Sequence, residues 1–242
     1  MLRLMSRFTV IRSLSIALVF FAFGAGRSQA VCPIPDVLVC EEFFRSTNVF
    51  IGTVIQARTL PPGAKFFDEW SYELRVQRVF RGPEIKTITV FTENDNGRYP
   101  LVKGETYLLF AAPSEERLTI NGCGNNRKLS EAQSAIREIH QILKAAESAS
   151  GGEIKGRLVQ GRFIDLGVEG VTISADGGET HLTSVTDKDG WFHFQVPAGK
   201  NKVTVKTAKY SIQTYELSFF QPENVEIFNG SCAQLLLFAI PK

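Results

Sequence analysis

The stretch Thr183–Phe194 (TSVTDKDGWFHF) decides how the C-terminal half of this sequence folds. Its centre, Asp187-Lys188-Asp189-Gly190, is a turn signal, and Gly190 is free to adopt the positive φ that a tight turn requires. Phe192 and Phe194 follow two residues apart, so in a strand both side chains project to one face. We therefore predict a hairpin closed at Gly190, with the two phenylalanines filling a hydrophobic core.

Short apolar runs separated by turn signals surround this stretch from residue 152 to 242. Asp176-Gly177-Gly178 and Pro197-Ala198-Gly199 are two of these signals. Seven or eight short strands at such spacing indicate a β-sandwich. The expected strands are Glu153–Val159, Gly170–Ala175, His181–Thr186, Trp191–Val196, Lys202–Thr207, Gln213–Phe219, Val225–Phe228 and Ala233–Ala239.

Residues 31 to about 122 also have the pattern of short strands between turns. In Ser71–Phe80, for example, Tyr72 and Leu74 fall on one face and Glu73 and Arg75 on the other, as in a half-buried strand. The sequence is therefore mainly β in both halves. The expected strands of this first part are Val49–Ala57, Ser71–Phe80, Lys86–Thr92, Thr106–Ala112 and Arg117–Asn121.

One helix follows these strands. Ser130-Glu131-Ala132-Gln133 matches a capping box, in which Ser130 accepts a hydrogen bond from the backbone amide of Gln133. Apolar residues then recur at helical spacing up to Ala146, so the helix is amphipathic and covers a sheet or barrel. The small polar segment Ala146–Gly152 stops the helix, and we place a domain boundary there.

The first 30 residues have the three regions of a secretory signal. Basic residues precede the apolar run Ser13–Phe23, and a small-x-small cleavage pattern follows, Ser28-Gln29-Ala30. The apolar run is short for a bilayer span, which makes an uncleaved membrane anchor the weaker interpretation. We therefore expect an exported chain, secreted or periplasmic, that has no membrane span once the signal is removed.

Removal of the signal changes the charge of the chain. The formal net charge of the whole sequence is +2, and residues 1–30 hold four arginines and no acidic residue, so the mature chain carries +2 − 4 = −2. A nucleic-acid-binding protein would need a basic surface, so we do not expect nucleic acid as a partner. The remaining 242 − 30 = 212 residues suffice for two domains.

The C-terminal pattern resembles the carboxypeptidase regulatory-like, transthyretin-related domain. The residues that carry the resemblance span Gly152–Val159, Leu166–Ile173, Thr183–Phe194 and Val196–Val205, so it covers nearly all of residues 152–242. The resemblance implies a β-sandwich that mediates contacts within exported proteins and has no catalytic role.

The N-terminal part, residues 31–147, resembles the netrin-like domain typified by tissue inhibitors of metalloproteinases. The resemblance rests on Cys32, Cys40, Val49–Val54, Arg78–Gly82, Gly104–Ala111 and Gly122-Cys123 ahead of the helix. It implies a five-stranded OB-like barrel with a C-terminal helix. Spacing alone leaves all three pairings of the four cysteines open. The resemblance suggests a Cys32–Cys123 disulfide, which leaves Cys40 and Cys232 for a bridge between the domains.

Cys32 also decides between two functions. In the animal inhibitors the amino-terminal cysteine chelates the zinc of the protease through its α-amine and carbonyl, which here requires cleavage after Val31. The cleavage rule prefers Ala30, and one extra residue would turn the amine into an amide that cannot bind zinc. Pro33 follows Cys32 where the inhibitors have a further cysteine. A bacterial lipoprotein would also need a small residue in place of Val31.

The sequence gives little support for catalysis. It has three histidines, His140, His181 and His193, no HExxH, and none of the G-x-S-x-G, P-loop or dinucleotide-binding motifs. We expect His181 and His193 to meet across a hairpin as a solvated pair rather than as a metal site. Asp187 and Asp189 lack the further ligands of a calcium site. Lys200, Lys202 and Lys206 share one face of a strand that we expect at a sheet edge, where they would limit aggregation or contact a polyanion or glycan.

The sequence thus favours a non-catalytic exported protein that binds proteins or extracellular surface components. It predicts no catalytic residue, metal or cofactor. The alternative is a metalloprotease inhibitor that acts through the N-terminal edge around Cys32.

Overall fold

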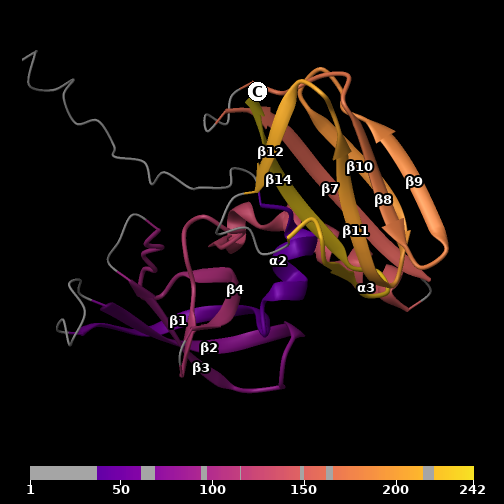
Figure 1. Ribbon diagram of the computed structural model, residues 1–242. Coiled ribbons are helices and arrows are strands. Elements are labelled where there is room, and N and C mark those ends of the chain that lie inside the picture. The colour runs from indigo at the N-terminus through magenta and orange to yellow at the C-terminus, as the bar shows by residue number, and fades with distance from the viewer. Residues whose placement is uncertain are drawn as a thin grey trace, which may run out of the picture. The chain divides into compact units, whose positions relative to one another are not determined.

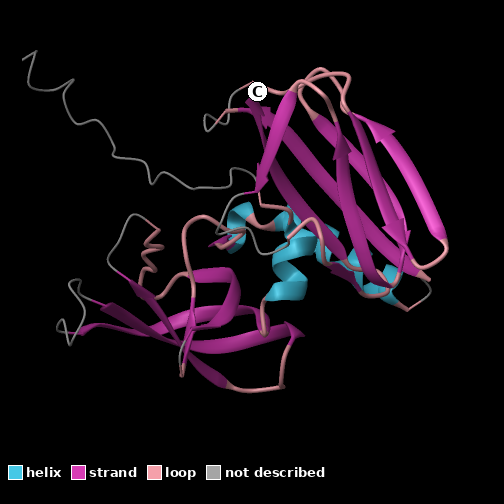
Figure 2. Cartoon of the chain, in the orientation of Figure 1, coloured by secondary structure: helices cyan, strands magenta, loops and turns pink. Residues whose placement is uncertain are grey.

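The computed structural model describes residues 37–60, 69–93, 97–114, 116–147, 150–161, 166–214 and 221–242. Strands make up most of these residues, which confirms the mainly β prediction (Figure 2). The described helices are α2 (Val39–Arg45), the short 3-10 helix η1 (Leu129–Glu131) and α3 (Gln133–Ala146). No described helix is both long and apolar enough to cross a membrane.

The first described strands close into a five-stranded barrel. They are hydrogen-bonded in the order β1-β2-β3-β5-β4, and β4 pairs again with β1, which closes the ring (Figure 1). β3 and β5 run parallel, whereas β1–β2, β2–β3, β5–β4 and β4–β1 are antiparallel. The predicted OB-like barrel is thereby confirmed. Its strands are β1 (Asn48–Leu60), β2 (Glu69–Arg81), β3 (Thr87–Glu93), β4 (Thr106–Ser114) and β5 (Arg117–Thr119), with β6 (Arg127–Lys128) added beside β4.

Side chains along the barrel strands point alternately into and out of the barrel, and both sets are apolar, so two hydrophobic clusters form. Phe50 and Val54 of β1 point into the barrel, where Tyr72 and Leu74 of β2 are fully buried as predicted. Residues of opposite parity on β1 and β4 face outward and are covered by α3, whose Ile139 is also fully buried. The amphipathic helix therefore covers the barrel wall, as the sequence indicated.

The start of this helix was predicted incorrectly. Ser130 does not cap it, because Ser130 lies within η1 and α3 begins three residues later at Gln133. The amide of Ala132 donates to the carbonyl of Leu129, so a tight 3-10 turn rather than a side chain leads into the helix. Among the described contacts, no side-chain hydrogen bond caps α3.

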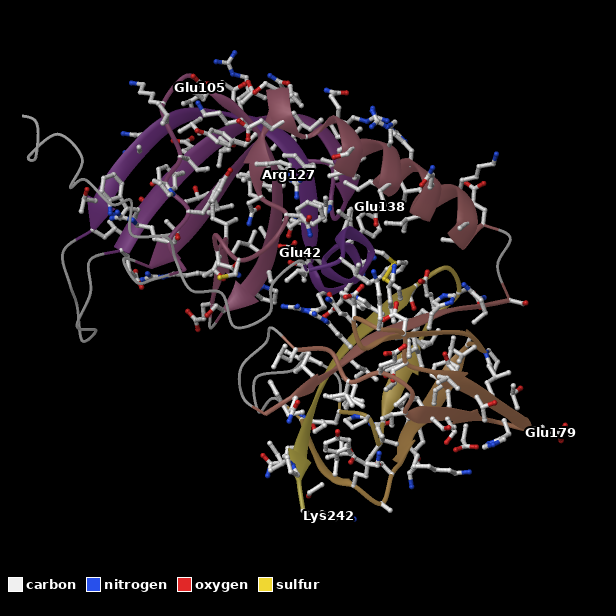
Figure 3. The ribbon with its side chains drawn as sticks, turned by 90° about the horizontal axis from the view of Figure 1, so that it is seen from above. Glu42, Glu105, Arg127, Glu138, Glu179 and Lys242 are labelled. Carbon is white, nitrogen blue, oxygen red and sulfur yellow. A yellow bond between two sulfur atoms is a disulfide. The ribbon has the colours of Figure 1, made fainter. Side chains whose placement is uncertain are left out.

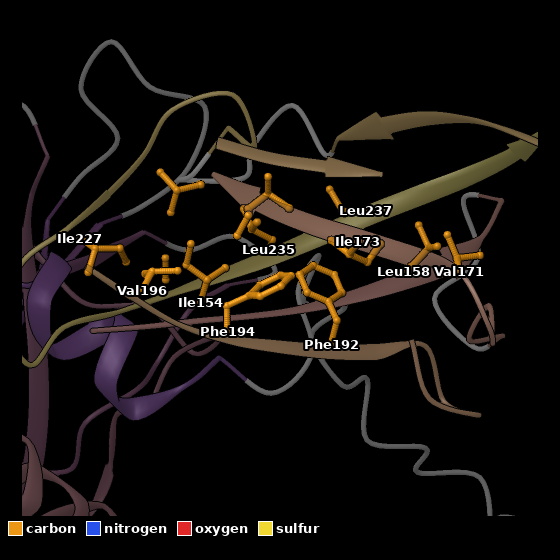
Figure 4. Close-up of a cluster of buried hydrophobic side chains, with 14 of the residues drawn as sticks. Ile154, Leu158, Val171, Ile173, Phe192, Phe194, Val196, Ile227, Leu235 and Leu237 are labelled. Carbon is orange, nitrogen blue, oxygen red and sulfur yellow. The ribbon is translucent and has the colours of Figure 1, made fainter. Parts of the chain in front are cut away.

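The remaining described strands form a sandwich of two four-stranded sheets, which confirms the predicted architecture. One sheet has the order β10-β7-β14-β12 and the other β13-β11-β8-β9, and β14 runs parallel to β7. Figure 4 shows Phe192 and Phe194 between the sheets, where each is 3% exposed, as predicted. The strands are β7 (Gly151–Gln160), β8 (Thr172–Gly177), β9 (Thr180–Val185), β10 (Trp191–Pro197), β11 (Gly199–Lys206), β12 (Tyr210–Thr214), β13 (Val225–Ile227) and β14 (Cys232–Pro241).

The turn at Asp187–Gly190 forms as expected but does not close a hairpin. Asp187 Oδ1 accepts hydrogen bonds from the amides of Asp189 (2.9 Å) and Trp191 (2.8 Å), and Gly190 has φ +80°. The turn nevertheless leads from β9 in one sheet to β10 in the other. The hairpin prediction is wrong because local turn chemistry does not specify which sheet receives the next strand.

Candidate functional site

The short helix α2 is the structural centre of the candidate site, and none of the sequence patterns above predicts it. Val39 and Phe43 lie four residues apart on its buried face and join the cluster under α3. Acidic residues stand in its first turn and Arg45 in its last, which complements the helix dipole. The helix ends at Ser46, whose backbone is already extended, just before β1.

One side of α2 is fixed to the sandwich strand β14. A disulfide joins Cys40 to Cys232, with 5.9 Å between their Cα atoms and a sequence separation of 192 residues. The amide of Leu38 also donates to Oε1 of Gln234 over 3.0 Å. Cys40 and Cys232, whose pairing the spacing of the cysteines leaves open, are thus bonded to each other.

The opposite side of α2 is fixed to the loop that follows β5. The buried carboxylate of Glu42 accepts hydrogen bonds from the backbone amide of Asn125 and from its Nδ2, the latter over 2.8 Å. Asn125 Nδ2 also donates to the carbonyl of Val37 (2.9 Å), and Arg127 donates to Asn125 Oδ1 (2.7 Å). A side chain at Gly124 would overlap the Glu42 carboxylate, so only glycine permits this approach.

Two neighbouring carboxylates on α2 are buried, which is unusual for charged groups. Burial raises the pKa of Glu41 to about 7, against the opposing effects of Arg45, whose Nη1 lies 3.4 Å from Glu41 Oε1. Burial likewise raises the pKa of Glu42, and its hydrogen bonds from Asn125 oppose this change. Figure 3 labels Glu42 and Arg127 in this region. No periodicity in the sequence indicates that two adjacent glutamates should be buried.

A pocket of about 530 Å³ lies beside α2, between α3 and the first residues of β7 and β14. The Cys40–Cys232 disulfide lines it, and so do polar side chains from α3 and the sandwich. Figure 3 shows Glu138 of this pocket on α3. The described lining residues with charged, amide or hydroxyl side chains include Ser134, Arg137, Glu138, Gln141, Glu153 and Gln195.

The residues predicted for the N-terminal edge are only partly described. Cys123 is disulfide-bonded. Cys32, its suggested partner, lies outside the described residues together with Ala30, Val31 and the rest of the predicted signal. The Cys32–Cys123 pairing and the signal cleavage site therefore remain predictions, as does the division of the chain into two domains at Ala146–Gly152.

The structure does not bring the histidines together. His181 lies on β9 and contacts Asp176, whereas His193 lies on β10 in the other sheet, with its Nε2 3.0 Å from Glu153 Oε1. The predicted pair across a hairpin is therefore wrong, because the two strands belong to different sheets. Within the described ranges, no cluster of three or more histidine, cysteine, aspartate or glutamate residues could hold a metal ion.

The lysine row lies only partly at a sheet edge. Lys200, Lys202 and Lys206 are exposed, and the three-residue β13 pairs with β11 only from Gly199 to Asn201. Among the described strands, Lys202 and Lys206 therefore have a neighbour on one side alone, which is β8. Contact of the row with a polyanion or glycan stays a prediction.

Comparison with known proteins finds similarity among solved structures. No protein-family model matches this chain. No curated protein matches it. Among solved structures it is similar to the Bacillus anthracis TIE protein, with a TM-score of 0.31 and 10% sequence identity; the match covers 81% of this chain and 35% of the other. This chain thus spans about a third of the length of that structure.

Proposed function

We propose that this chain is an exported, non-catalytic protein that binds other proteins or surface components through the pocket beside α3. The observation that supports this proposal is the 530 Å³ pocket, which is lined by polar side chains from two parts of the fold. Its volume lies within the range of about 300–1,000 Å³ typical of binding sites. The Cys40–Cys232 disulfide is what an exported protein in an oxidising compartment would contain.

Site-specific cross-linking tests this proposal. A photo-cross-linking residue replaces Gln141, which is exposed on α3 and lines the pocket, and in a control variant it replaces the exposed Lys202 on β11. On intact cells of the source, we expect discrete cross-linked products from position 141 and none at position 202. Equal labelling from both positions, or none from position 141, would show that the pocket is not the binding surface.

The second candidate function is inhibition of a metalloprotease through the N-terminal edge around Cys32. The disulfide at Cys123, in the loop that Asn125 holds against α2, favours it because it offers an anchor for that edge. N-terminal sequencing of the exported protein is the first test, since only a chain that begins at Cys32 has the α-amine that zinc requires. A protease panel is the second: sub-micromolar inhibition that disappears when the N-terminus is blocked would replace the first proposal.

A further inference from the structure

One face of α3 presents a row of polar groups to the pocket. Ser134, Arg137, Glu138 and Gln141 recur at the three- and four-residue spacing that places side chains on one side of a helix. Within the described part of the chain, no hydrogen bond or ion pair involves the side chain of Arg137, Glu138 or Gln141. These groups are therefore available to a ligand without first breaking a contact.

The opposite wall of the pocket comes from the sandwich. Glu153 of β7 and Gln195 of β10 are paired neighbours across the two strands. His193 lies beside both, with its Nε2 3.0 Å from Glu153 Oε1 and 3.4 Å from Gln195 Nε2. This arrangement holds a second carboxylate at the pocket, opposite the one on α3.

The charges and acceptors of the two walls select the kind of ligand. Among the described residues that line the pocket, Glu138 and Glu153 carry two negative charges and Arg137 one positive charge, an excess of one negative charge. His193 contacts Glu153 but does not itself line the pocket. The side-chain oxygens of Gln141 and Gln195 add neutral acceptors. None of the described residues that line the pocket is aromatic, and most of their side chains that are larger than alanine are polar, so hydrogen bonding and charge are the main means of recognition.

We propose that this pocket binds the basic side chain, lysine or arginine, of a protein partner; this rests on the proposed binding function and names its ligand class. An ammonium or guanidinium group has several donors and no acceptor, which complements two carboxylates and two amide oxygens. Hydrogen bonds between oppositely charged groups are about twice as strong as neutral ones, so Glu138 and Glu153 should provide most of the specificity. The disulfide fixes the wall that contains Cys40 and Cys232.

Nuclear magnetic resonance titration of the mature protein tests the ligand class. The probes are Nα-acetyl-lysine amide and Nα-acetyl-arginine amide, and the control probes are the corresponding norleucine and glutamate amides. We expect the basic probes to shift the amide resonances of Gly151, Gly152 and Gln195, which line the pocket, and the control probes not to do so. The variants Glu138→Gln and Glu153→Gln should each weaken binding about fivefold to tenfold.

The matched control is Glu131→Gln, which removes an exposed glutamate on η1 that does not line the pocket. It should leave the affinity unchanged, and thermal melting confirms that every variant is folded. The ligand class is refuted if the norleucine probe shifts the same resonances equally, if no basic probe shifts them, or if neither Gln variant weakens binding. If one of these results occurs and position 141 still gives cross-linked products, only the ligand class is refuted and the proposed binding function stands. If position 141 gives no cross-linked products, both the binding function and the ligand class are refuted.

Discussion

Replacing Glu41 with glutamine should stabilise the protein above neutral pH, because folding buries this carboxylate. Its side chain is 4% exposed, and burial raises its pKa from 4.5 to about 7. Glutamine has nearly the same shape but no charge, so it avoids the cost of desolvating a carboxylate. Arg45 Nη1 lies 3.4 Å from Glu41 Oε1, and the substitution removes this ion pair. The gain in the free energy of unfolding is reduced by the stabilisation that the ion pair provides.

The sign and size of the effect follow from the two pKa values. The folded protein holds the proton of Glu41 up to about pH 7, whereas the unfolded chain releases it near pH 4.5. Proton binding therefore favours the folded state: this stability is fully present below pH 4.5 and is lost as the pH rises through 7. The difference of 7 − 4.5 = 2.5 pH units corresponds to about 3 kcal/mol. We expect a net gain of about 1–3 kcal/mol for Glu41→Gln at pH 8.

Urea unfolding followed by tryptophan fluorescence between pH 4.5 and 8 measures this effect. The free energy of unfolding of Glu41→Gln, relative to the native sequence, should rise from near zero at the acid end to its full value at pH 8. Glu226→Gln, which removes an exposed glutamate on β13, is the control and should show no such trend. The reasoning is refuted if Glu41→Gln is less stable than the native protein at pH 8, or if the difference between them is the same at every pH.

Three further substitutions test other parts of the structure, each by urea unfolding under non-reducing conditions. The double variant Cys40→Ala/Cys232→Ala should lose about 4–5 kcal/mol, because its disulfide spans 192 residues and restricts the unfolded chain strongly; no change in the unfolding midpoint would contradict this. Gly124→Ala should lose about 1–3 kcal/mol, since the new methyl group displaces the Glu42 carboxylate, and a neutral effect would argue against that close approach. Phe192→Ala should lose about 3–5 kcal/mol through the cavity that it leaves in the sandwich core, and a loss below 1 kcal/mol would place this ring outside the core.

The sequence predicted the barrel and the sandwich because both depend on short-range alternation. Tyr72 and Leu74 are buried on one face of β2, and Phe192 and Phe194 on one face of β10, as the period of two indicates. Such patterns arise wherever one face of a strand meets a core. They can be read without knowing which strand lies next to which.

The candidate site could not be predicted in the same way, because long-range contacts form it. The helix α2 has seven residues, too few for a clear helical period, and it is held by Asn125 and Gln234, which are distant in the sequence. Glutamates such as Glu41 and Glu42 are ordinarily exposed, so only their tertiary partners explain their burial. The pocket likewise joins residues of α3 to residues of β7 and β14.

The distance in sequence between Cys40 and Cys232 also determines when, during synthesis, each cysteine becomes available to form a disulfide. At about 5–20 residues per second, the 192 residues that separate them take roughly 10–40 s to synthesise. Cys32 precedes Cys40 and Cys123 emerges during that interval, so two non-native partners are available to Cys40 before its native one exists. Native pairing is therefore reached if Cys32 and Cys123 are occupied first, if Cys40 stays reduced until Cys232 exists, or if an early mispairing is reversed by thiol–disulfide exchange. We expect the yield of native protein to depend on a disulfide isomerase more than on the supply of oxidant.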